Sequence, residues 1–116
     1  MEKEVTVNGR KYVLAPYNHE QQTIIKDESF TTVPGSDEIR TRIGMLNSLT
    51  VYFSLVKWEV KDKQGNTVSI TPKLDLEGKN MQTLRNFRQH MPPNDMDSLF
   101  VEASKLQRMS DTEKKN

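Results

Sequence analysis

Alternating hydrophobic and polar positions open the chain. Val5 and Val7 precede Asn8-Gly9, and Tyr12 and Leu14 follow it. Both residues of an Asn-Gly pair tolerate the positive φ of a two-residue turn, so such a pair between alternating runs signals a hairpin. We predict a β-hairpin over residues 5–14.

A short helix is predicted after Pro16, which ends the second strand. Asn18 stands three residues before Gln21, a spacing at which the Asn18 side chain can cap a helix. The helix carries Ile24 and Ile25 and should be two or three turns long.

A polar loop and a long central helix are predicted next. Residues 28–35 are mixed and polar and end in Pro34-Gly35, which predicts a mobile loop. Ser36 is a good N-cap, and hydrophobic residues then recur every three or four positions. This stripe comprises Ile39, Ile43, Leu46, Leu49 or Thr50, Phe53 and Val56, widened by Met45, Tyr52 and Leu55. We interpret it as a helix buried on more than one side. Gly44 costs about 1 kcal/mol relative to alanine, so we expect a close helix crossing or backbone contact there.

The period of the pattern changes to two near Val56. A turn-rich segment, residues 62–66, then separates two alternating runs, which predicts a second hairpin over residues 57–70. Alternatively, the helix runs on through Trp58, because Val56 and Val60 also share a helical face. The pattern leaves both structures open.

Two short helices are predicted to complete an α+β domain over residues 1–109. Pro92-Pro93 ends the first helix, and Asn94 caps the second, with Asp95 and Asp97 in its first turn. Their inner faces are formed by Met81, Leu84, Phe87 or Arg88 and Met91, and by Met96, Leu99, Phe100, Ala103 and Leu106. The polar residues 110–116 are predicted to be a disordered tail.

Composition narrows the classes of function. The chain has 116 residues, of which 34% are hydrophobic and 28% charged, so we expect one thin core, completed by a second copy in a homo-oligomer. The net charge of +1 implies neither nucleic acid nor an anionic membrane as a partner. The chain has no cysteine, signal peptide or membrane-length apolar run, which fits a protein of the cytoplasm.

No pattern of catalytic or metal-binding residues is found. His19 and His90 lie far apart in sequence, and neither stands beside a second ligand at metal spacing. The adjacent carboxylates Asp27-Glu28 and Asp37-Glu38 suit helix ends and solubility, since neighbours in sequence point to different sides of a helix. We therefore predict no enzyme, no cofactor and no metal.

Two groups of residues are candidates for binding. A basic cluster, Lys79, Arg85, Arg88 and His90, could hold phosphates, although a solvated face explains it better because no aromatic stacking platform accompanies it. The tentative protein-binding residues are Met45, Leu49, Tyr52 and Trp58. Methionine adapts to irregular surfaces, and tryptophan often anchors interfaces, but core filling is the alternative for each.

Several segments together resemble a known family. They are the hairpin of residues 5–14, the run Ser54–Val60 that reaches Trp58, the turn Asp62–Asn66, and Pro72. With the closing helices they look like the tail assembly chaperones of long-tailed phages, over about half of the chain. Residues 31–35 and 74–80 match nothing in that pattern.

The resemblance implies a non-enzymatic chaperone in the host cytoplasm. Its partner would be the tape measure protein or another tail protein, bound as an apolar helix along the surface that borders the central helix. The alternatives are a structural head-tail joining or tail completion subunit and, third, a small nucleic-acid-binding module.

Overall fold

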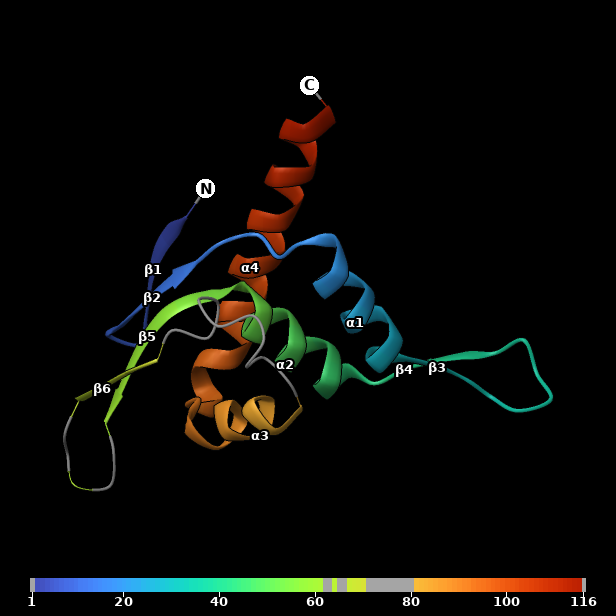
Figure 1. Cartoon of the computed structure of the whole chain (residues 1–116), viewed down its shortest axis with the longest axis horizontal. Helices are drawn as coiled ribbons and strands as arrows, with labels where there is room; N and C mark the ends of the chain where they lie inside the picture. Colours follow the sequence, from blue (N-terminus) through green and yellow to red (C-terminus); the bar gives the residue numbers. More distant parts are fainter. Residues whose placement is uncertain (1, 62–63, 65–66, 71–80, 116) are drawn as a thin grey trace.

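The computed structural model describes residues 2–61, 64, 67–70 and 81–115. It has the predicted α+β architecture, in which a four-stranded antiparallel sheet packs against helices, and a two-stranded arm projects away from them (Figure 1). The sheet order is β1-β2-β5-β6, formed by β1 (Lys3–Val7), β2 (Arg10–Leu14), β5 (Leu55–Lys61) and β6 (Thr67–Ile70).

The first hairpin is confirmed. Asn8 and Gly9 have φ of 51° and 78°, and β1 pairs with β2 from Val7 opposite Arg10 to Lys3 opposite Leu14. The Asn-Gly turn thus sets the register that turns Val7, Tyr12 and Leu14 towards the core.

The capped helix after Pro16 is also confirmed as α1 (His19–Ser29). The Asn18 side chain accepts a hydrogen bond from the Gln21 backbone N–H at 2.8 Å, and the Gln21 side chain accepts one from the Asn18 N–H at 3.0 Å. This reciprocal pair is a capping box, which satisfies two donors that the first turn leaves open.

The predicted loop at 28–35 and the predicted helix start at Ser36 are both wrong in part. Residues 30–41 form a hairpin, here called the arm, made of β3 (Phe30–Thr32) and β4 (Ile39–Thr41). Gly35 reverses the chain with φ of 77°, and Ser36 Oγ accepts from the Glu38 N–H at 3.0 Å inside the turn instead of capping a helix. The β-branched residues on both sides of the turn favour strands, and cross-strand pairing overrides the helical spacing of Ile39 and Ile43.

The central helix is therefore shorter than predicted. It is α2 (Ile43–Ser54), and its N-cap residue Arg42 makes no side-chain capping bond. The expectation of a close contact at Gly44 is wrong, because a Cβ added there would meet no atom within 4 Å.

The second hairpin is confirmed, and the alternative of a helix through Trp58 is wrong. The chain passes directly from α2 into β5 at Leu55, and Trp58 pairs with Tyr12 on one side and Ile70 on the other. Most of the predicted turn, residues 62–66, and the segment 74–80 lie outside the described residues.

Only one of the two C-terminal helices is short. They are α3 (Met81–His90) and α4 (Pro93–Lys115), and α4 includes residues 110–115, which were predicted to be disordered. No proline or glycine follows Pro93, so no residue type that breaks a helix interrupts α4. The helix begins at Pro93, where a fixed φ suits the first helical position, so the prediction of Asn94 as its N-cap is wrong and Asn94 lies inside the first turn.

One hydrophobic core joins the first hairpin to all four helices. The predicted inner faces of α3 and α4 are confirmed for the side chains that the structure describes, with Phe87 rather than Arg88 turned inward, while the side chain of Met81 lies outside the described part. The core consists of Val7, Tyr12, Leu14, Ile25, Met45, Leu49, Val51, Tyr52, Phe53, Leu55, Leu84, Phe87, Met91, Leu99, Ala103 and Leu106.

Candidate functional site

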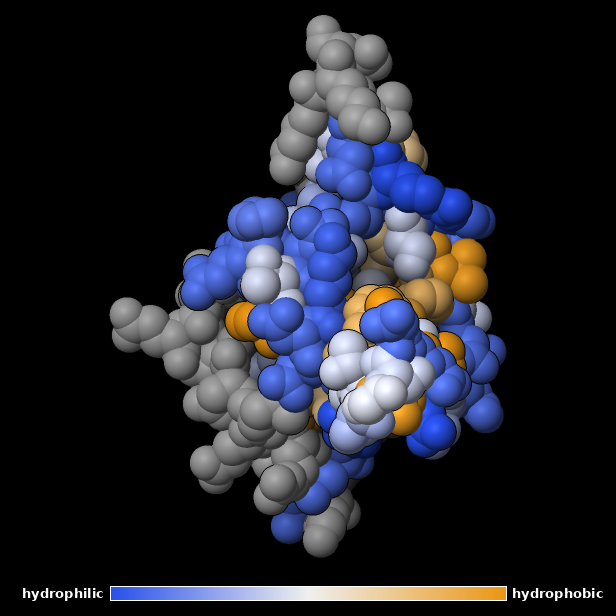
Figure 2. All heavy atoms as spheres, turned by 90° about the vertical axis from the view of Figure 1, so that its right-hand side faces the viewer, coloured by the Kyte–Doolittle hydropathy of each residue, from blue (hydrophilic) through white to orange (hydrophobic). Residues whose placement is uncertain are grey.

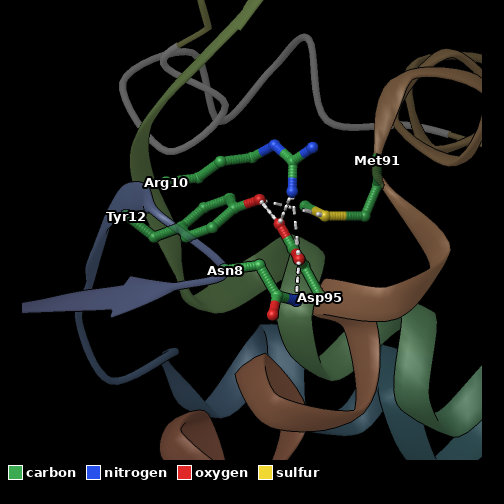
Figure 3. Close-up of polar contacts among 5 residues, drawn as sticks. All are labelled: Asn8, Arg10, Tyr12, Met91 and Asp95. Carbon is green, nitrogen blue, oxygen red and sulfur yellow. Dashed lines mark hydrogen bonds and ion pairs between the residues drawn. The ribbon is translucent and has the colours of Figure 1, made fainter.

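A buried polar cluster lies between the first hairpin and the start of α4 (Figure 3). The Asp95 carboxylate, 0% exposed, accepts hydrogen bonds from Asn8 Nδ2 at 2.7 Å, from Arg10 Nη1 at 3.2 Å and from the Tyr12 hydroxyl. The Met91 thioether lies beside the same hydroxyl, 4.0 Å away. The Asp95 carboxylate thereby connects the turn of the first hairpin and β2 to the first turn of α4.

In this cluster, the Asp95 carboxylate favours a protonated Tyr12, and the Tyr12 hydroxyl favours an ionised Asp95. Burial acts to raise the pKa of Asp95, but the hydrogen bonds from Tyr12 and Asn8 and the Arg10 guanidinium outweigh it and lower the pKa. Burial and the neighbouring Asp95 raise the pKa of the Tyr12 phenol, which therefore stays a donor. Because the carboxylate is enclosed by its donors, it cannot reach a substrate, and the cluster acts as a latch between segments.

An open groove runs along α4 where α1 begins. Its cavity volume is about 490 Å³, and the residues that line it are Tyr17, Gln22, Phe100, Val101, Ser104, Gln107, Arg108 and Asp111. Gln107 holds the groove's wall in place, since its side chain accepts from the Tyr17 N–H at 3.0 Å and donates to the Tyr17 carbonyl at 3.4 Å. Burial, with a smaller contribution from Asp111, raises the pKa of Tyr17.

Apolar side chains on α4 extend this surface. Val101 in the groove is 47% exposed and Met109 is 53% exposed, eight residues further along the same helix. Residues seven or eight apart share a helix face, so a second exposed apolar side chain lies on this side of α4 beyond Val101, with the polar residues Ser104, Lys105 and Arg108 between the two. The rim pairs a basic with an acidic residue, Arg108 and Asp111, and so carries no net charge.

A second apolar surface surrounds the arm. All six strand residues of the arm are exposed, among them the large apolar residues Phe30 and Ile39, and Ile24 on α1 and Ile43 at the start of α2 are exposed as well. Figure 2 views the molecule from the side on which the arm projects and shows hydrophobic residues between polar ones around it.

Three of the four predicted protein-binding residues lie in the core and not on either surface. Met45, Leu49 and Tyr52 are buried in the core, where the Tyr52 ring lies 5.3 Å from that of Phe87. The side chain of Trp58 lies outside the described part. The stripe of α2 is wide because α1, α3 and α4 all pack on it, so a wide stripe here reflects several neighbours in one chain.

The basic cluster and the histidines are only partly described. Arg88 and His90 are exposed, and Arg88 Nη2 lies 3.2 Å from Met45 Sδ, while Lys79 and the side chain of Arg85 are outside the described residues. Among the residues that are described, no three of His, Cys, Asp and Glu come together as a metal site would require.

Sequence reasoning missed Asp95 as a buried group and missed the groove. Asp95 was assigned to a first turn, where acids are common, and its partners are more than 80 residues away in sequence. The groove arises only where the chain entering α1 lies against α4, at Tyr17 and Gln107. Val101 and Met109 carried a signal, since both are apolar and lie off the predicted inner face of α4.

No protein-family model matches the chain, and neither a curated protein nor a solved structure does. Within the described ranges, no helix is long and apolar enough to cross a membrane.

Proposed function

We propose that this chain is a non-enzymatic tail assembly chaperone that holds an apolar helix of the phage tape measure protein in the groove between α1 and α4. The proposal rests on one observation, an open groove with an apolar wall and a rim of compensating charges. Such a groove suits the apolar face of an amphipathic helix, which needs apolar contacts along its length and little charge.

The dimensions of the groove support a helical ligand. From Phe100 to Asp111 it follows α4 for about 16 Å at the rise of an α-helix, which corresponds to roughly three turns of a bound helix. Phe100 packs on the core from the groove floor, and Val101 stands exposed beside it. A partner helix would cover Val101 and, about two turns on, Met109.

Co-expression with apolar helical fragments of a tape measure protein tests the proposal. The chain should keep these fragments soluble and co-purify with them, and Val101→Asp should abolish both effects because it places a charge against the apolar face. Val101 is 47% exposed, so this variant should fold.

Ile39→Asp is the matched control, since Ile39 is also exposed but lies on the arm, away from the groove. It should leave fragment binding intact. If the unmodified chain solubilises no fragment and forms closed rings by itself, the chaperone proposal fails and a structural joining or completion subunit becomes the better explanation.

A further inference from the structure

We propose that two copies of this chain pair through the outer edge of β4, antiparallel and centred on Ile39, so that the two arms form one four-stranded sheet. The partner is a second copy of the chain. The proposal is independent of the groove and of what the groove binds.

In the part of the chain that the structure describes, the arm has an unpaired strand edge and exposed side chains on both strands, as expected of a segment that pairs with another strand. It is a two-stranded sheet, β3 pairs only with β4 among the described strands, and every residue of both strands is exposed. Two strands alone are marginally stable in water, and natural edges are usually protected by lysine, proline or a covering segment. The edge of β4 instead carries Ile39, which is 66% exposed.

The hydrogen bonds of the arm show which backbone groups face outward. Val33 N–H donates to the Glu38 carbonyl at 3.1 Å, and Arg42 N–H donates to the Ser29 carbonyl at 2.6 Å. In an antiparallel ladder these directions alternate, so the groups of Glu38 and Arg42 face β3 and those of Ile39 face the open edge. A second strand can therefore exchange two backbone hydrogen bonds at Ile39.

The charges on β4 favour one register of the strand pairing, and they favour a second copy of the chain as the partner. With Ile39 opposite Ile39 of the second copy, each Glu38 lies opposite an Arg40, and both pairs are non-hydrogen-bonded pairs, in which side chains are closest. Centring the pairing on Glu38 or on Arg40 instead would oppose like charges. The tripeptide Glu38-Ile39-Arg40 is thus complementary to itself when read antiparallel, which is what a two-fold interface between identical chains requires.

The pairing also enlarges an apolar face. Phe30 pairs with Thr41 and Thr32 with Ile39, so these four side chains share one face of the arm, whereas Arg40 lies on the other. Doubling the arm places two copies of Phe30 and Ile39 together on that face, with the charged pairs on the opposite one.

Charge exchange tests the pairing by sedimentation of the full chain alone. The chain should dimerise, and Glu38→Lys or Arg40→Glu should each raise the dimer dissociation constant by about tenfold or more, because both cross-strand pairs become repulsive. The double variant E38K/R40E should dimerise again, and an equimolar mixture of the two single variants should form mixed dimers.

A cysteine placed at the two-fold axis gives an independent readout, since the chain has no cysteine of its own. Ile39→Cys should form a disulfide-linked dimer on mild oxidation, because hydrogen-bonded partners have Cα atoms about 5.5 Å apart, within disulfide range. Thr31→Cys should not, because Thr31 lies on β3 and the two β4 strands separate it from its counterpart in the second copy.

Glu4→Lys is the matched control, the same change at an exposed position on β1, the edge strand of the large sheet. It should leave the dimer unchanged. The proposal is overturned if the chain stays monomeric at about 100 µM, a concentration that detects even weak pairing. It is also overturned if E4K disrupts the dimer as E38K does, or if E38K weakens capture of tape measure fragments without altering self-association. Failure of groove binding in Val101→Asp would leave this dimer intact, so the two proposals are separable.

Discussion

At the scale of single residues, Asp95 is a fully buried carboxylate held by three side-chain donors. A buried carboxylate without partners is strongly disfavoured, whereas this one receives hydrogen bonds from an amide, a phenol and a guanidinium. Its donors come from the turn and second strand of the first hairpin, so the latch stabilises the contact between the hairpin and α4.

Asp95→Asn should lower the free energy of unfolding by about 2 kcal/mol at pH 7, because it removes the charge and directs an amide N–H at groups that are donors. The folded-state pKa of Asp95 is depressed below its ordinary value of 3.8, so the carboxylate contributes its full stabilisation above that value and loses it as the pH falls through the folded pKa. The stability curves of the two proteins should therefore converge below about pH 4.

Urea unfolding at pH 7 and at lower pH measures this difference. Asp97→Asn is the control, an exposed carboxylate two residues along the same helix, and it should change stability little at any pH. A constant gap between Asp95→Asn and the unmodified chain down to pH 2 would show that the Asp95 charge is not what stabilises the latch.

At the scale of elements, turns and helix ends follow local backbone requirements. The hairpin turn needs positive φ at Asn8 and Gly9, whereas Gly44 lies in the first turn of α2, where any residue can adopt the helical conformation. Both glycines have open space where a Cβ would stand, so packing does not distinguish them.

The same substitution should therefore have opposite effects at the two glycines. Gly44→Ala should stabilise the protein by about 0.5 kcal/mol, since alanine loses less backbone freedom on folding. Gly9→Ala should destabilise it by about 1 kcal/mol, because a Cβ disfavours the left-handed conformation at φ of 78°.

Thermal unfolding of both variants distinguishes an effect of backbone conformation from an effect of packing around the added methyl group. A loss of stability in Gly44→Ala would mean that α2 has a close neighbour at its start after all. Equal effects at the two positions would contradict the argument from backbone conformation.

At the scale of the whole molecule, the core connects segments from both ends of the chain. Val7 near the start and Leu106 near the end belong to one cluster, and α2 lies between α1 and α4. Since the sheet and the helices share this cluster, they should unfold together.

Leu99→Ala should lower the free energy of unfolding by about 3 kcal/mol, because Leu99 is fully buried and the truncation leaves a cavity. Helical circular dichroism and the fluorescence of the sole tryptophan, Trp58, should still report one midpoint, shifted equally. Separate midpoints would show that the sheet and the helices are independent units. Val101→Ala, on the exposed face of the same helix, should change the free energy of unfolding reported by either signal by less than about 0.5 kcal/mol.

The sequence alone determined the features that depend on near neighbours. Asn8-Gly9 and the capping pair Asn18 and Gln21 act through backbone conformation and hydrogen bonds within a few residues, so the turn and the helix cap were both predicted at the correct residues. The inner faces of α3 and α4 followed from helical periodicity in the same way.

Tertiary structure decided everything that depends on distant partners. Ile39 fits a helical stripe with Ile43 and equally fits a strand, and only the pairing of β4 with β3 selects the strand. Met45, Leu49 and Tyr52 suggested a binding face because periodicity counts apolar residues without showing how many neighbours cover them. The same limit hid Asp95, since nothing in its first helical turn indicates an arginine, a tyrosine and an asparagine more than 80 residues earlier. Local signals set the conformation of turns and helix caps, but burial and strand pairing are properties of the packed chain.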